Sequence, residues 1–146
     1  MGECRRLELR LDSVISSVDA AELIATGLAR EGGYGEDQVD RLGMAVREAT
    51  ANAVTHGNAY SADKSVHFSV EMNDGRLVVK VRDEGEGFDA SEVPDPTSVE
   101  NLLRASGRGL LLMRALVDEV DVRNASPSGT QVVLILHGPA TEEDGQ

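Results

Sequence analysis

The chain of 146 residues is 40% hydrophobic and 27% charged, and it carries a formal net charge of −12. This length suits one domain with a single core, and the acidic balance argues against nucleic-acid or anionic-membrane partners, because both need a basic surface. The single cysteine, Cys4, excludes an intramolecular disulfide and a zinc site made of several cysteines. Since no apolar run approaches the roughly 20 residues that cross a bilayer, we expect a soluble, cytoplasmic protein.

The first half of the chain predicts one strand and two helices. Residues 6–11 alternate between charged residues and leucine, a period of two that is typical of a half-buried strand. Asp12 can cap the amphipathic helix that we predict over residues 14–30. After a glycine-rich loop, a second helix is predicted over residues 37–56, because apolar residues recur there at helical spacing and Gly57 follows as a stop signal.

The second half of the chain is predicted to form mainly strands. Residues 66–72 alternate in hydropathy and, after a turn, residues 77–82 return as the second strand of a hairpin. The irregular stretch 84–106 is long for a loop in a compact domain, and such loops are usually functional lids or disordered segments. Beyond it we predict one helix and two strands, over residues 107–117, 119–124 and 129–136.

These elements together predict an α+β fold, a two-layer sandwich in which helices cover one face of a mixed sheet. We expect one domain over residues 1–137, followed by an acidic, frayed tail over residues 138–146. The sequence holds no internal repeat and no linker that would divide the chain.

Three short motifs carry the candidate chemistry, and the first lies near the end of the second predicted helix. Glu48 and Asn52 are four residues apart, so they share one face of that helix at an angular separation of about 40°. This face is either a plain solvated helix face, or it is the wall of a site into which the carboxylate and the carboxamide project together. In a site, the oxygen of Asn52 suits a hard cation such as Mg²⁺, and Glu48 could accept a proton from a hydroxyl nucleophile.

The second motif, Asp83-x-Gly85-x-Gly87, directly follows a predicted strand. It is either a strand-ending turn or a pocket wall, because its glycines allow a flat ligand to approach the backbone closely. A buried aspartate there is suited to accept a hydrogen bond from an exocyclic amine such as that of adenine. Residues 85–90 also match a dinucleotide-binding pattern, which we reject because two prolines follow and no helix starts there.

The third motif, Gly107-Arg108-Gly109, stands immediately before a predicted apolar helix. It is either a plain entry loop or a phosphate site, because glycines at a helix start expose backbone N–H groups and the helix dipole adds positive potential. The sequence lacks the lysine-containing phosphate-binding loop and the motifs of eukaryotic-type protein kinases. If ATP binds, its phosphates must therefore be neutralised by Mg²⁺, backbone amides and arginine.

In this order, the motifs resemble those of the GHKL ATPase superfamily, which has the Bergerat fold, and within it the small anti-sigma factor serine kinases. The likeness extends from about residue 5 to 137, and it includes Gly129-Thr130 before the last predicted strand. Its three boxes are similar to Glu48-x-x-x-Asn52-Ala-x-x-His56-Gly57, Asp83-x-Gly85-x-Gly87-Phe88-Asp89 and Gly107-Arg-Gly109-Leu110-x-Leu-Met113.

The resemblance implies a role for each matching position. Asn52 would hold Mg²⁺ on the ATP phosphates, Glu48 would be the general base that activates a substrate serine, and Asp83 would accept from the adenine amino group. Residues 88–106 would be the ATP lid. The positions implied to bind the nucleotide are Asn52, Asp83, Gly85, Gly87, Gly107, Arg108, Gly109, Leu110 and Thr130.

The resemblance also implies partners, because such proteins bind a sigma factor, phosphorylate a serine of a small antagonist protein and commonly form homodimers. Our leading hypothesis is an Mg²⁺- and ATP-dependent serine kinase that sequesters a sigma factor. The alternatives are an ATP-dependent switch or adaptor that transfers no phosphate, and an acidic interaction domain that binds no nucleotide. Transfer from labelled ATP distinguishes the first hypothesis from the second, and ATP binding distinguishes both from the third.

Overall fold

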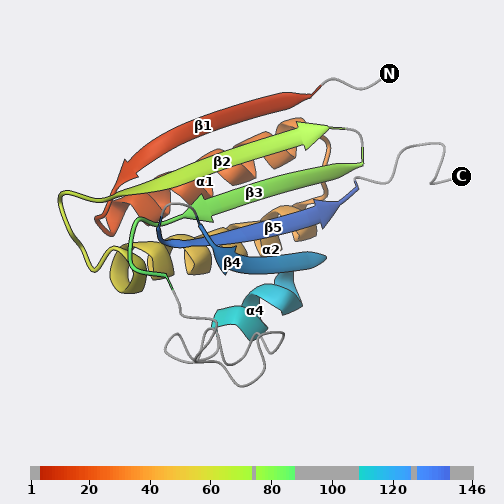
Figure 1. Cartoon of the computed structure of the whole chain (residues 1–146). Helices are drawn as coiled ribbons and strands as arrows, with labels where there is room; N and C mark the ends of the chain where they lie inside the picture. Colours follow the sequence, from red (N-terminus) through yellow and green to blue (C-terminus); the bar gives the residue numbers. More distant parts are fainter. Residues whose placement is uncertain (1–3, 74, 88–108, 126–127, 139–146) are drawn as a thin grey trace, which may run out of the picture.

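The computed structural model describes residues 4–73, 75–87, 109–125 and 128–138. Within these ranges the strands and helices follow one another in the predicted order (Figure 1). Their bounds are β1 (Arg5–Asp12), α1 (Ser16–Glu31), α2 (Glu36–Asn52), β2 (Ser65–Asn73), β3 (Arg76–Arg82), α4 (Gly109–Leu116), β4 (Glu119–Asn124) and β5 (Thr130–His137), with a π-helical segment, η1 (Ala53–Gly57), directly after α2.

The predicted elements are confirmed, with bounds that differ by one or two residues at most ends. The second predicted helix differs more, because its α-helical part stops at Asn52 and the chain continues to Gly57 as η1. The predicted lid over residues 88–106 and the part of the predicted tail beyond residue 138 lie outside the described residues.

The five strands of the described part form one sheet in the order β1-β2-β3-β5-β4. Every neighbouring pair is antiparallel, so our expectation of a mixed sheet was wrong. The connections explain three of the four pairs. Between β1 and β2 the chain runs along the sheet twice, in α1 and then in α2, so β2 starts at the end of the sheet where β1 stops (Figure 1). Only a few residues separate β2 from β3 and β4 from β5 in the sequence, and strands joined so closely pair antiparallel.

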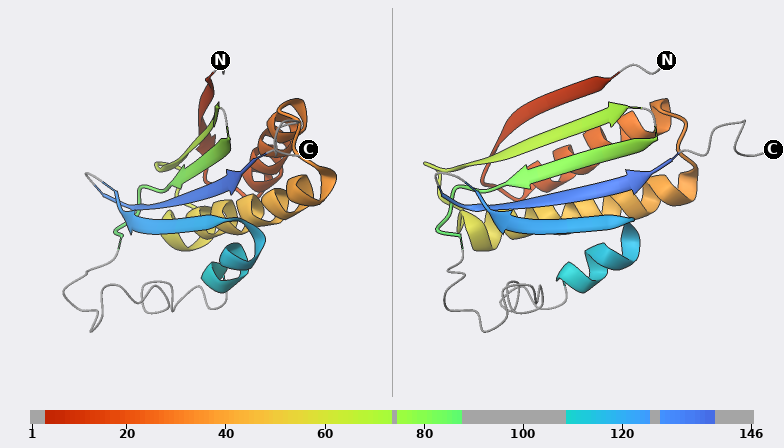
Figure 2. Two further views of the ribbon diagram at one scale, coloured as in Figure 1. Left: turned by 90° about the vertical axis from the view of Figure 1, so that its right-hand side faces the viewer. Right: turned by 45° about the vertical axis from the view of Figure 1, so that its right-hand side comes forward.

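The helices cover one face of the sheet, which confirms the predicted α+β sandwich. Figure 2 shows α1 and α2 lying along this face, with α4 next to α2 and close to β4. The opposite face, which we call the open face, is covered by no described helix. None of the described helices is both long and apolar enough to cross a membrane.

The core lies between the sheet and the helices, and it follows from the period-two pattern of the strands. In β2, Phe68 and Val70 point toward the helices and are each 1% exposed, whereas His67 and Ser69 point to the open face and are partly exposed. From α2, Leu42 is fully buried in the same core. Since aromatic residues make up 3% of the chain, aliphatic side chains fill most of this space, and each buried leucine stabilises the fold by about 2–5 kcal/mol relative to alanine.

Tyr34, in the turn between α1 and α2, is a buried residue whose hydroxyl group lacks a hydrogen-bond partner among the described residues. Burial, together with the negative charge of Asp118, raises the pKa of Tyr34 from its ordinary value of 10.0 to about 12. The folded state therefore keeps this proton at a pH where the unfolded chain releases it. Stability from this group is complete below pH 10.0 and falls as the pH rises toward about 12.

We expect Tyr34→Phe to remove this alkaline loss of stability, and to be neutral or stabilising near neutral pH because it deletes an unsatisfied buried hydroxyl. Urea unfolding of both proteins across the alkaline range measures the effect. Tyr60→Phe is the matched control, since Tyr60 is 57% exposed. Parallel pH profiles of wild type and Tyr34→Phe would show that Tyr34 does not cause the loss.

Candidate functional site

The first candidate pair, Glu48 and Asn52, lies on the last turns of α2. Both side chains are half-buried, and the Asn52 Nδ2 group donates a hydrogen bond of 3.3 Å to Glu48 Oε2. The four-residue spacing therefore brings them together on one helix face, as predicted from the sequence. His56, which continues the same line, lies on η1 and is exposed.

The third sequence motif reaches this pair through the start of α4. Gly109 is buried, and a Cβ atom at this position would lie 2.6 Å from Glu48 Oε2 and 3.1 Å from Asn52 Nδ2. A side chain at this position would displace the end of the Glu48 side chain, so the glycine allows the start of α4 to lie against the Glu48–Asn52 pair as it stands. The side chain of Leu110 is 1% exposed and packs in the core, so only its backbone can face a ligand. Gly107 and Arg108 lie outside the described residues.

Asp83 directly follows β3 and is buried, with 6% of its surface exposed. Its Oδ1 atom accepts hydrogen bonds from the backbone N–H groups of Gly85, at 2.9 Å, and Thr130, at 3.1 Å. Burial raises the pKa of Asp83, while these two hydrogen bonds and the charges of Lys64 and Arg82 act in the opposite direction. The backbone thus fixes one carboxylate oxygen, and the other, Oδ2, makes no hydrogen bond within the described residues.

Several glycine backbones pack closely around Asp83, and one of them lies against its second oxygen. A Cβ atom on Gly57, the last residue of η1, would run into Asp83 Oδ2, and one on Gly85 would run into the carbonyl oxygen of Gly57. Gly87 follows with a φ of 78°, in the left-handed region, and a Cβ atom there would collide with Gly129. The three chain segments meet here because none of these positions carries a side chain.

The π-helical segment η1 joins these two groups of residues. Asn52 ends α2 and Gly57 ends η1, so one continuous helical stretch carries both Asn52 and the glycine that lies against the Asp83 carboxylate. A π-helical turn widens the helix, and such turns occur frequently at functional sites. The structure therefore brings residues from all three motifs, and Thr130, to one end of the sheet on its helical face.

Asn58 is a residue of this region whose structural role sequence reasoning missed, because we took it only as part of a helix stop. It is 1% exposed, and its Nδ2 group donates to Ser13 Oγ and to the Ser65 carbonyl, each at 2.9 Å. Its Oδ1 atom accepts from the Glu84 backbone N–H at 2.7 Å. These partners lie 45, 7 and 26 residues away, so no local pattern could have indicated them.

We expect Asn58→Ala to lower the free energy of unfolding by about 2–3 kcal/mol, because it removes three hydrogen bonds and leaves buried partners unsatisfied. Urea denaturation measures this change. Asn73→Ala, at the exposed end of β2, is the matched control and should stay within about 0.5 kcal/mol of wild type. Equal effects of the two substitutions would contradict a structural role for Asn58.

Comparison with known proteins agrees with this arrangement. The profile of the histidine kinase-like ATPase domain matches residues 12–136. The serine-protein kinase RsbW of Bacillus subtilis is 33% identical over 146 residues, which cover 94% of this chain and 90% of the relative. RsbW of Staphylococcus epidermidis is 32% identical over 149 residues, covering 96% of this chain and 92% of that protein.

A solved structure shows the same fold. In the crystal structure of the RsbU and RsbW domains of a Mycobacterium tuberculosis protein, the likeness covers 92% of this chain but 33% of that longer chain, with a TM-score of 0.67 and 21% sequence identity. The family profile spans nearly all of the described residues and contains the three motifs, so the resemblance seen in the sequence is confirmed. The chain belongs to the histidine kinase-like ATPase family.

Proposed function

We propose that this chain is an ATP-dependent protein serine kinase that phosphorylates a small anti-sigma factor antagonist and sequesters a sigma factor. The observation that carries the proposal is the contact between Glu48, Asn52 and the first residue of α4, Gly109. A carboxylate stands there beside a carboxamide and a helix N-terminus. Relatives at about one-third identity, covering nearly the whole chain, are named serine-protein kinases, which supports a protein serine as the acceptor.

The residues present fit a bound adenine nucleotide. Asp83 as a residue is 6% exposed, and its Oδ2 atom makes no hydrogen bond within the described residues, so this oxygen is suited to accept from the adenine amino group. Gly85, Gly87 and Thr130 would line the base pocket, since their side chains are absent or small. The backbone of Gly109 and Leu110 would face the phosphates, where a helix N-terminus favours anions. We assign Gly107 and Arg108 to the phosphates on their sequence motif alone.

Asn52 would hold Mg²⁺ through its carboxamide oxygen. Its Nδ2 group already donates to Glu48, so the oxygen is left free for a cation. A single protein ligand is sufficient, because Mg²⁺ usually keeps several waters and binds phosphate oxygens in addition. Among the described residues no cluster of three or more His, Cys, Asp or Glu side chains could form a separate metal cage.

The proposed reaction transfers a phosphoryl group to a serine hydroxyl. ATP supplies that group when bound, and Mg²⁺ supplies positive charge beside it. Glu48 accepts the hydroxyl proton as the serine oxygen forms its new bond, and it later releases that proton to solvent. The products are ADP and a phosphoserine. Asn52 holds the carboxylate in position through its hydrogen bond, which matters because positioning provides much of the catalysis in phosphoryl transfer.

The test is incubation of the chain with labelled ATP, Mg²⁺ and a small antagonist domain encoded near its gene. We expect label on one serine of that domain, and no label when this serine is replaced by alanine. Sedimentation analysis of the chain, alone and with the neighbouring sigma factor, tests the proposed homodimer and the sequestration. ATP binding without transfer to any candidate antagonist would support a nucleotide-dependent switch instead of a kinase.

A further inference from the structure

The open face of the sheet carries a row of cationic side chains at one end. The strand register places Arg10 of β1 opposite His67 of β2, and His67 opposite Arg82 of β3. The same row continues through Gln131 of β5 to Arg123 of β4. None of these five positions is acidic, although the chain as a whole has 26 acidic and 14 basic residues.

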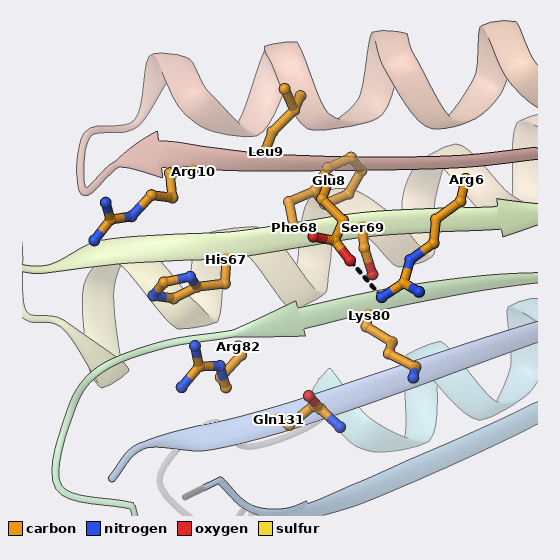
Figure 3. A pocket seen from close by; sticks show the side chains of 10 residues that line it. All are labelled: Arg6, Glu8, Leu9, Arg10, His67, Phe68, Ser69, Lys80, Arg82 and Gln131. Carbon is orange, nitrogen blue, oxygen red and sulfur yellow. Dashed lines mark ion pairs between the residues drawn. The ribbon is translucent and has the colours of Figure 1, made fainter. Parts of the chain in front are cut away.

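Part of this row lines a hollow of about 560 Å³ on the open face, shown in Figure 3. Arg10, His67 and Arg82 lie side by side along it, and Lys80 adds a cation from the next open-face position of β3. We call this hollow the basic groove. Val66 and Val81, the sequence neighbours of His67 and Arg82, are buried in the core on the other side of the sheet, so the groove is separate from the candidate nucleotide site.

Three cations of the basic groove are not held in an ion pair within the described residues, although Arg10 interacts at longer range with the charge of Glu84 and Arg82 with that of Asp83. Arg10, Lys80 and Arg82 make no ion pair with any other residue that the structure describes. His67 is different, because its Nε2 atom lies 2.5 Å from Glu84 Oε2. Neighbouring strands are about 4.8 Å apart, so Arg10 and Arg82, two strands apart, are separated by roughly 10 Å, close to the Debye length at physiological salt.

We infer that the basic groove binds a short acidic segment of a partner protein. A binding anion would relieve the mutual repulsion of Arg10, Lys80 and Arg82, and it would find all three on one open surface. The Cβ atoms of helical residues i and i+4 are about 5–6 Å apart, close to the spacing between neighbouring strands, so two acidic residues of a helical segment could each face one strand of the groove. The inference does not depend on the proposed kinase function, because the groove lies on the opposite face of the sheet.

The surroundings of the groove favour a short peptide over a nucleic acid. Glu8 lines the groove as the ion-pair partner of Arg6, and Glu84 and Asp121 lie beside it, so a long phosphate backbone would meet like charges there. A second copy of this chain is also disfavoured as an occupant, because two facing basic grooves would place arginine against arginine. The net charge of −12 opposes any longer polyanion in the same way.

The test uses a short fluorescein-labelled oligoglutamate peptide, with fluorescence anisotropy as the readout. We expect binding that weakens as salt is added, and that becomes about threefold to tenfold weaker in the double variant Arg10→Gln and Lys80→Gln. Arg76→Gln is the matched control, because Arg76 lies on the same face of β3 at its far end. Calorimetry with ATP checks that each variant keeps a folded nucleotide site. This control does not require the site to transfer phosphate.

Four results would overturn the inference. The first is an absence of peptide binding at low salt, and the second is an equal loss of binding in Arg76→Gln and the double variant. The third is binding of a single-stranded oligonucleotide or of inorganic phosphate that is tighter than binding of the peptide and depends on the same side chains. The fourth is dissociation of a wild-type dimer in the double variant, which would assign the groove to a contact between copies of the chain.

Discussion

Glu48→Gln is expected to lower the rate of phosphoryl transfer to serine by about 10²- to 10⁴-fold, the usual contribution of a general base. Glutamine has the same shape as glutamate but cannot accept the hydroxyl proton. It can still accept the hydrogen bond from Asn52 Nδ2, so the packing of α2 against Gly109 should be kept. ATP affinity, measured by calorimetry, should therefore change little while single-turnover transfer slows.

The matched control for this substitution is Glu36→Gln. Glu36 is the first residue of α2, is exposed, and lies about 18 Å of helix rise away from Glu48. Its replacement should leave transfer unchanged. If Glu48→Gln transfers phosphate at the wild-type rate, Glu48 is not the base. If both variants lose ATP binding, the substitutions have disturbed the fold. The role of Glu48 in transfer must then be measured with a different substitution.

Asp83→Asn is expected to weaken ATP binding by about 10- to 100-fold, the effect of losing a hydrogen bond to a charged acceptor in a buried pocket. The asparagine oxygen can still accept from Gly85 and Thr130, as Oδ1 of Asp83 does. Its amide NH₂ then replaces Oδ2, so a donor would face the adenine amino group. The loss should therefore come from the nucleotide contact while the fold is retained.

A nucleotide analogue makes this prediction specific. Purine riboside triphosphate lacks the amino group, so wild type should prefer ATP over it and Asp83→Asn should lose most of that preference. Asp12→Asn, at the exposed end of β1, is the control for a strand-ending aspartate. An equal drop for both nucleotides would show that Asp83 does not contact the amino group.

The same substitution has a pH consequence for stability. Because burial raises the pKa of Asp83, the folded state holds this proton more tightly than the unfolded chain does. Stability from this group is therefore highest below its ordinary value of 3.8 and falls as the pH rises through the folded-state pKa. Asp83→Asn should lack this decrease, which urea unfolding at acidic and neutral pH can detect.

Local patterns predicted most of the fold. Alternation over residues 66–72 predicted β2, and the spacing of Glu48 and Asn52 placed both side chains on one face of α2. The antiparallel pairing of β3 with β5 was not predictable, because these strands are separated by α4 and β4 in sequence. It depends on how α4 and β4 fold back, which no short stretch of sequence specifies.

The candidate site was predictable only in part, for the same physical reason. Glycines in the motifs indicated close backbone contacts, yet which backbones meet, such as Gly57 with Gly85, is a tertiary property. The π-helical turn η1 also has no sequence pattern of its own, so a continuous α-helix to His56 was the natural prediction. The basic groove arises from strand register, since Arg10 and Arg82 are far apart in the chain.

The most direct test of the proposed ATP site is a titration of the ¹⁵N-labelled chain with Mg²⁺ and a non-hydrolysable ATP analogue. We expect the backbone amides of Gly85, Thr130 and Gly109 and the side-chain amide of Asn52 to shift together with one saturation curve, while the amide of Arg10 on the open face stays unchanged. A single nucleotide site built from Glu48, Asn52 and Asp83 would be contradicted by any of three results. These are shifts confined to Gly85 and Thr130, shifts confined to Gly109 and Asn52, and shifts only on the open face.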